Sequence, residues 1–176
     1  MKNSLSTPAM LAATAICLGG AASAGAAVSR EGQALASASI SIAKAVEIGE
    51  HQGHGKTVGV EFDIEKGLPI WEVRILGADG VTEFKVDANS GTVVKIEDEH
   101  VRGRLTNFIT GTNLKDLEAV KTTFPEAVAI AEQLAKGKAV KVEVEHEHDH
   151  VQFDVFVRSG DDTKRFMVDG LSGKVL

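Results

Sequence analysis

The residues with the most distinctive chemistry are three histidines at alternate positions, His146, His148 and His150. Alternate side chains of an extended segment point to the same side, so these three imidazoles, which we call the histidine cluster, could converge on Zn²⁺, Cu²⁺ or Ni²⁺. Glu147 and Asp149 lie between them as alternative ligands. The same segment also fits the exposed tip of a hairpin, where a bend would splay the rings. The sequence leaves two interpretations open, a metal site and a solvated turn.

Catalytic chemistry has much less support. The only cysteine is Cys17, inside an apolar N-terminal stretch, and neither a Gly-x-Ser-x-Gly elbow nor a His-Glu-x-x-His helix is predicted. No pair of carboxylates stands in an apolar setting that would raise the pKa of one of them. We therefore expect a protein that is not an enzyme, with no cofactor other than a Zn²⁺ or Cu²⁺ ion at the histidine cluster.

The charge of the chain restricts its partners. The 176 residues include 19 Lys and Arg against 25 Asp and Glu, which gives a net charge of −6. Nucleic acids and anionic lipid surfaces attract proteins with clustered Lys and Arg. We therefore expect neither as a partner.

Residues 1–26 have the pattern of a secretory signal peptide. Lys2 is the only charged residue before Arg30, an apolar stretch covers residues 9–20, and small residues suited to cleavage follow it. The stretch is rich in Gly, Ala and Ser, which is too weakly apolar for a membrane span. We expect a periplasmic or secreted protein with no stable membrane insertion after cleavage. The mature chain would contain no thiol, so its stability would depend on its core rather than on disulfides.

The remainder of the chain is an internal repeat. Residues 41–94 align with residues 123–176 at an offset of 82 positions without a gap, and 18 of the 54 pairs are identical. Solenoid repeats have periods of roughly 20 to 50 residues, so this longer period indicates a duplicated small domain. Units of about 55 residues bury only about 60% of their unfolded surface, so we expect the two copies to stabilise each other.

Each copy begins with a helical pattern and continues with strand patterns. Thr123 caps a predicted helix that ends before Gly137, and Ser41 caps its counterpart in the first copy. After the helix, apolar and polar residues alternate, which indicates antiparallel strands with one buried face. Trp71 is in phase with the buried positions, so we predict that it lies in the core. The fold class is α+β, with two similar small units that each pack one helix on an antiparallel sheet of about four strands.

The strands and their turns resemble those of the PepSY domain. The similar segments are Val-x-Val-Glu after the helix, an aromatic–acidic–Val triplet at 71–73 and 153–155, and Phe-x-Val-Asp-x-x-Ser-Gly-x-Val at 84–93 and 166–175. PepSY domains occur in propeptides of secreted metallopeptidases and in many bacterial envelope proteins. The resemblance implies a regulatory, peptidase-inhibiting module without catalytic residues.

The aspartate and glycine that recur in the last hairpin have a structural explanation. Asp87 and Asp169 can accept hydrogen bonds from turn amides, and Gly91 and Gly173 suit turn positions with positive φ. We therefore predict that these four residues shape turns and do not form a ligand site.

The repeat suggests domain boundaries and two functional hypotheses. We expect a first domain over 37–98, a linker over 99–118 and a second domain over 119–176, with residues 114–120 extending the second helix towards its N-terminus. The first hypothesis is a module that binds another envelope or secreted protein, such as a peptidase or its precursor, through an exposed sheet face or an unpaired strand edge. The second is an envelope protein that binds or senses a metal through the histidine cluster.

Overall fold

The computed structural model describes residues 29–98, 114–147 and 150–176, and these residues form the expected α+β fold. The helices are α1 (Arg30–Ser37), α2 (Ile42–Gly53), α4 (Leu114–Ala119) and α5 (Phe124–Ala135). The strands are β1 (Lys56–Glu65), β2 (Leu68–Gly77), β3 (Gly80–Asp87), β4 (Val93–Asp98), β5 (Lys138–Glu147), β6 (His150–Ser159) and β7 (Asp162–Asp169). No helix of these described segments is long and apolar enough to cross a membrane.

The repeat seen in the sequence is reproduced in the elements. The bounds of α5, β5, β6 and β7 are those of α2, β1, β2 and β3 moved by 82 residues. The helix caps also repeat, because the Ser41 and Thr123 hydroxyls both accept the amide of the residue three positions later. Both helices then end in a left-handed residue, His54 or Lys136. Two copies of one fold follow each other along the chain.

The two copies join into one antiparallel sheet of seven strands, in the order β4-β3-β2-β1-β5-β6-β7. β1 pairs with β5 in antiparallel register, with Val60 opposite Val142. These two valines are equivalent positions of the repeat, so an approximate twofold axis passes between them. The second copy has three strands rather than about four, and an isolated bridge between Val168 and Val175 stands where its fourth strand would begin.

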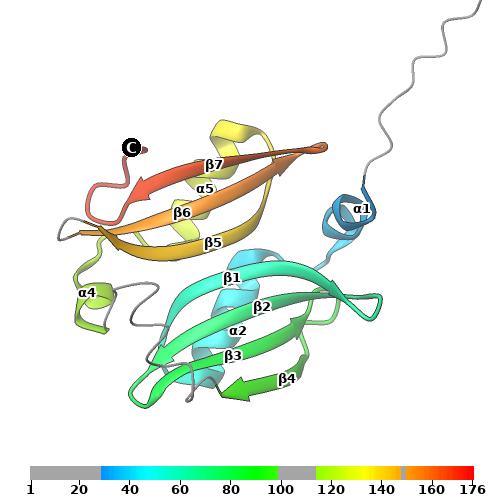
Figure 1. Ribbon diagram of the computed structural model, residues 1–176, viewed down its shortest axis with the longest axis horizontal. Coiled ribbons are helices and arrows are strands. Elements are labelled where there is room, and N and C mark those ends of the chain that lie inside the picture. Colours follow the sequence, from blue (N-terminus) through cyan, green and yellow to red (C-terminus); the bar gives the residue numbers. More distant parts are fainter. Residues whose placement is uncertain (1–28, 99–113, 148–149) are drawn as a thin grey trace, which may run out of the picture.

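One face of the sheet carries the core. Figure 1 shows α2 and α5 together behind the strands, and each packs mainly on the second strand of its own copy. α2 approaches closely, because a Cβ atom at Gly49 would lie 2.7 Å from Cγ1 of Val73. Trp71 is buried as predicted, and its indole N–H donates to the Ile40 carbonyl at 2.9 Å.

The short helices α1 and α4 extend the repeat beyond the aligned residues. They lie at opposite ends of the line where β1 meets β5 (Figure 1). Their buried leucines, Leu35 and Leu117, are also 82 positions apart. The expected extension of the second helix was wrong, because α4 ends at Ala119 and α5 begins only at Phe124. Each copy is thus a short helix, a longer helix and a meander of strands.

The last hairpin of each copy has the predicted turn. The carboxylate of Asp87 accepts the amides of Asn89 at 2.8 Å and Ser90 at 2.7 Å, which lowers the pKa of Asp87. Asp169 makes the same contact with the amide of Ser172 at 2.7 Å. Gly91 and Gly173 have φ of +75° and +67°. These four residues shape turns, as the sequence indicates.

Candidate functional site

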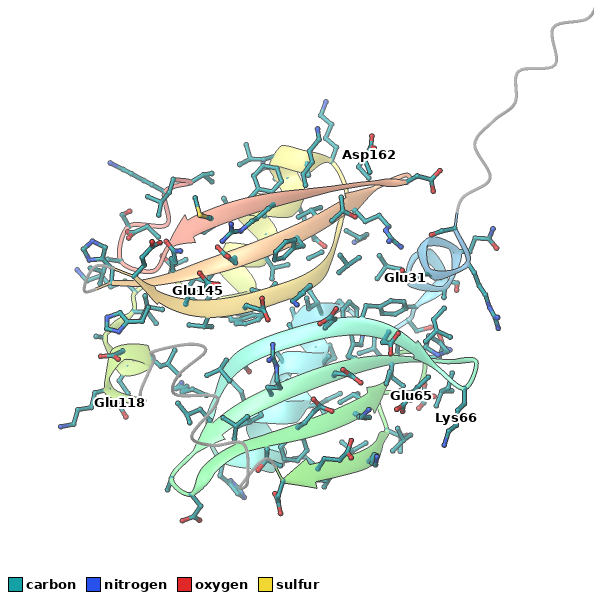
Figure 2. The ribbon with its side chains drawn as sticks, in the orientation of Figure 1. Glu31, Glu65, Lys66, Glu118, Glu145 and Asp162 are labelled. Atoms are coloured by element: carbon teal, nitrogen blue, oxygen red, sulfur yellow. The ribbon has the colours of Figure 1, made fainter. Side chains whose placement is uncertain are left out.

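The face of the sheet opposite α2 and α5, which we call the open face, is covered with charged side chains. Residues that point away from the buried valines point to this face, because side chains alternate along a strand. Figure 2 shows Glu65 and Glu145 at two points on it. The ion pairs of this face join eight carboxylates, Glu61, Glu65, Glu72, Glu83, Glu97, Glu143, Glu145 and Asp154, to five cations, Arg74, Lys85, Lys95, Lys141 and Arg165.

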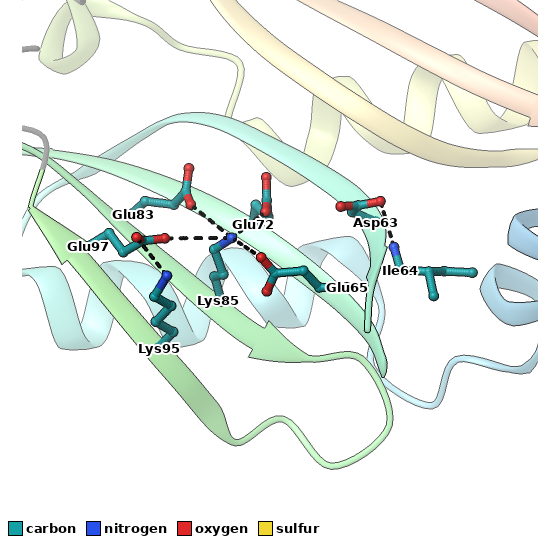
Figure 3. Close-up of polar contacts among 8 residues, drawn as sticks. All are labelled: Asp63, Ile64, Glu65, Glu72, Glu83, Lys85, Lys95 and Glu97. Atoms are coloured by element: carbon teal, nitrogen blue, oxygen red, sulfur yellow. Dashed lines mark hydrogen bonds and ion pairs between the residues drawn. The ribbon is translucent and has the colours of Figure 1, made fainter. Parts of the chain in front are cut away.

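The centre of the first copy is a lysine surrounded by carboxylates (Figure 3). The Lys85 ammonium lies 2.9 Å from a Glu72 oxygen and 3.0 Å from a Glu65 oxygen. Glu97 and Glu83 follow at 3.6 and 3.8 Å. The Lys85 side chain is only 8% exposed, so it is an ion held under the surface by its acidic neighbours.

The hydrogen bonds in this cluster shift the pKa values of its members. The pKa of Lys85 is raised well above its ordinary value because Glu72 and Glu65 accept from its ammonium, and burial opposes this effect. The pKa of Glu65 is lowered mainly by the hydrogen bond from Lys85. The pKa of Glu97 is lowered mainly by the hydrogen bond from Lys95. At neutral pH the cluster therefore holds more negative than positive charge.

A second group of ions crosses the junction between the copies. Arg74 of the first copy pairs with Glu143 of the second at 3.2 Å, and Lys141 pairs with Glu61 at 3.3 Å. The Arg74 guanidinium lies over Gly59, in the space that a Cβ atom at this position would enter. The open face is therefore continuous across the junction.

The second copy places its buried ion pair differently. Asp154, the counterpart of Glu72, is 2% exposed and accepts two hydrogen bonds from Arg165. These bonds raise the pKa of Arg165. The position equivalent to Lys85 is Met167, so the second copy has moved its cation to another position on the neighbouring strand. The two copies share the charged character of the face and differ in its pattern.

Of the histidine cluster, His146 lies near the end of β5 and His150 is the first residue of β6, and His148 falls outside the described residues. The His146 imidazole lies near Asp116 of α4, with Nδ1 of His146 3.6 Å from Oδ2 of Asp116. In the register of the hairpin, His146 lies opposite Val151 and His150 opposite Glu147. Paired residues share a face and successive residues alternate, so His146 and His150 lie on opposite faces. Within the described segments, no group of three His, Cys, Asp or Glu could hold a metal ion. Coordination by all three histidines stays a prediction.

The sequence of residues 146–150 also matches the pattern His-Glu-x-x-His. The zinc peptidase motif of this form needs a helix, because only helical spacing brings residues four apart onto one face. Here β5 ends at Glu147 and β6 begins at His150, so the two histidines belong to different strands. This segment therefore lacks the geometry of a zinc peptidase site.

The charged clusters were not recognised in the sequence as a site. Their members occupy the polar positions of alternating strands, so their exposure to one face could be expected. Which acid meets which base depends on the register between strands. In the observed register, Glu72 of β2 lies opposite Lys85 of β3. The buried face and the turn between the strands determine this register, and neither names the partner of a given charge.

The chain belongs to the PepSY family, described as "Peptidase propeptide and YPEB domain". The family model matches residues 39–97 and again residues 123–176. PepSY domains are propeptide-type modules and are generally non-catalytic. The chain has no match among curated proteins. A crystal structure of a candidate lipoprotein from Clostridium difficile 630 is 15% identical, covering 79% of this chain and 91% of that one with a TM-score of 0.49.

Proposed function

We propose that this chain is an exported, non-catalytic binding module whose open face docks on another protein, a secreted peptidase or its precursor. The observation that carries the proposal is the open face itself. It is a broad charged surface, continuous across both copies, in a family of propeptide-type modules. The apolar segment at residues 1–26 supports export.

The charges of the open face favour a partner with a basic surface. Its ion pairs include more carboxylates than cations, and the whole chain carries a net charge of −6. Complementary charge speeds association and selects partners, and its effect decreases as salt increases. The cross-strand ion pairs also fix the side chains before binding, which lowers the entropy lost on association.

A direct test measures inhibition of a panel of secreted metallopeptidases, together with a pull-down from an envelope extract. The matched variants are Glu61→Gln with Glu145→Gln on the open face and Glu47→Gln on the helix side. We expect inhibition or capture that weakens with salt and with the open-face variant, and that Glu47→Gln leaves unchanged. Absence of inhibition together with an empty pull-down would count against the proposal. If the open-face variant binds as tightly as the helix-side variant, the open face is not the contact surface, and a strand edge or the helix side would be the surface to test.

A further inference from the structure

Strand β4 forms one of the two edges of the seven-stranded sheet (Figure 1). It pairs with β3 on its inner side, and no strand of the described residues lies along its outer side. The pairing with β3 is regular from Lys95 to Asp98, after a register shift at the start of β4. A strand edge presents backbone N–H and C=O groups that can pair with another chain. The regular part of β4 can therefore extend the sheet.

The side chains of β4 combine exposed apolar groups with charges of opposite sign. Ile96 lies opposite Phe84, whose ring approaches α2, so Ile96 is on the helix side of the sheet. It is 55% exposed, and Val94 is 49% exposed. Lys95 and Glu97 lie on the open face, where their charged groups are 2.7 Å apart. The edge thus offers apolar contact on one face and charge on the other.

The sequence of β4 is complementary to itself in antiparallel pairing. If a twofold axis passes through the centre of an Ile96–Ile96 pair, Lys95 of each copy faces Glu97 of the other on the open face. A register centred on Lys95 or on Glu97 would place like charges opposite each other, which is destabilising. A register centred on Val94 would pair Lys95 with Val93. Charge complementarity therefore selects the register centred on Ile96.

The protein already contains a junction of this design. β1 and β5 are equivalent strands of the repeat, and they join edge to edge in an antiparallel register of three residue pairs. Val60 and Val142 face each other at its centre, and Glu61 lies opposite Lys141 with their charged groups 3.3 Å apart. A pairing of two β4 strands centred on Ile96 would repeat this pattern of a central apolar pair beside opposite charges.

The other edge of the sheet, β7, does not have these features. Val168 is bridged to Val175, and the Leu176 amide donates to the Met167 carbonyl at 2.9 Å, so the last part of β7 is covered. The remainder of β7 carries two adjacent exposed cations, Lys164 and Arg165. Charged side chains of this kind protect a strand edge from pairing. β4 is therefore the edge that suits a second copy of the chain.

From these observations we propose that two copies of this chain associate through β4, in an antiparallel pairing centred on Ile96 that joins their sheets into one. A contact between two short strands is small, so the dimer should be weak and should depend on concentration. The twofold axis is perpendicular to the sheet, so both open faces lie on the same side of the dimer. The proposal does not rest on the proposed protein-binding function, and either can fail without the other.

The test uses two charge reversals, Lys95→Glu and Glu97→Lys, and measures self-association by analytical ultracentrifugation. Each variant alone places like charges opposite each other twice in its own dimer. An equimolar mixture of the two variants restores both pairs of opposite charge in a heterodimer. The matched control is Lys164→Glu, at an exposed position of β7. A cross-strand pair of opposite charges contributes about 0.2–1 kcal/mol, so the loss of two pairs corresponds to a roughly two- to thirtyfold weaker affinity.

A further variant, Ile96→Lys, blocks the centre of the pairing without changing an ion pair of the open face. It keeps the test decisive if Glu97→Lys is unstable, because Glu97 also lies 3.6 Å from the Lys85 ammonium. Thermal unfolding in dilute solution shows which variants are folded.

We expect the unmodified protein to form dimers as its concentration rises to about 1 mM. Each charge reversal should weaken association by at least twofold, Ile96→Lys should remain monomeric, and the mixture of the two reversals should associate like the unmodified protein. Lys164→Glu should leave association unchanged. The proposal is overturned if the unmodified protein stays monomeric, if folded Lys95→Glu or Ile96→Lys associates with unchanged affinity, if two folded reversals do not associate when mixed, or if Lys164→Glu weakens association equally.

Discussion

Replacing Lys85 with methionine tests whether the ions of the open face act as a cluster. The substitution copies Met167, which occupies the equivalent position in the second copy. It removes the ammonium of a side chain that is only 8% exposed. Four carboxylates that lay 2.9–3.8 Å from this ammonium then lose their positive partner. Removal of one partner from a buried ion pair costs about 3–5 kcal/mol. Glu65 and Glu97 are 45% and 43% exposed and can regain water, so we expect a loss of about 3 kcal/mol.

The assay is thermal and urea unfolding at pH 7, where this loss corresponds to a decrease in Tm of roughly 6–12 °C. Lys95→Met is the matched control, because the Lys95 side chain is 52% exposed and should contribute no more than about 1 kcal/mol. In a double-mutant cycle, Glu72→Gln should cost less in the Lys85→Met background than in the unmodified chain.

The stability difference between Lys85→Met and the unmodified chain should depend on pH through the carboxylate of Glu65. The pKa of Glu65 is lowered from 4.5 in the folded chain, so its contribution to stability is complete above pH 4.5 and is lost as the pH falls through the lowered value. Lys85→Met removes the cause of this shift. The difference in stability between the two proteins should therefore decrease as the pH falls below 4.5. A loss below about 1 kcal/mol at pH 7, or the same loss at pH 7 and pH 3, would refute this electrostatic reasoning.

Three further predictions test other parts of the structure. The carboxylates of Glu50 and Glu132 accept equivalent strand amides at 3.0 and 2.9 Å, so alanine at either position should cost about 1–3 kcal/mol in urea unfolding, and very unequal losses would contradict their equivalence. Leu35→Ala and Leu117→Ala should each lower the free energy of unfolding by about 2 kcal/mol, because both leucines are buried; no loss would show that the short helix does not pack as described. Isothermal titration with Zn²⁺ and Cu²⁺ should give a heat that disappears when the whole histidine cluster is changed to alanine, and equal weak heats from both proteins would end the metal hypothesis.

The sequence predicts the parts of this fold that depend on local patterns. The repeat and the alternation of apolar residues predicted the helix and the strands of each copy, the burial of Trp71 and the turns at Asp87 and Asp169. These features need only spacing and turn chemistry.

Features that depend on contacts between distant residues could not be predicted in this way. Alternation shows which side of a strand is buried and not which strand lies beside it, so the pairing of Val60 with Val142 was not foreseen. Helix α1 was not predicted, and residues 114–119 were expected only as an extension of the second helix, because Leu35 and Leu117 are the single identical pair when residues 30–37 are aligned with residues 112–119.

The central claim, that the open face is the binding surface, can be tested directly because Cys17 is the only cysteine of the chain. Single cysteines are introduced by Glu61→Cys and Glu145→Cys on the open face and by Glu47→Cys on the helix side, each with Cys17→Ser. The rate of maleimide modification is measured with and without a peptidase that the protein inhibits. We predict that the peptidase slows modification at both open-face cysteines at least tenfold and leaves the helix-side cysteine unchanged. Protection of the helix-side cysteine alone would contradict the account.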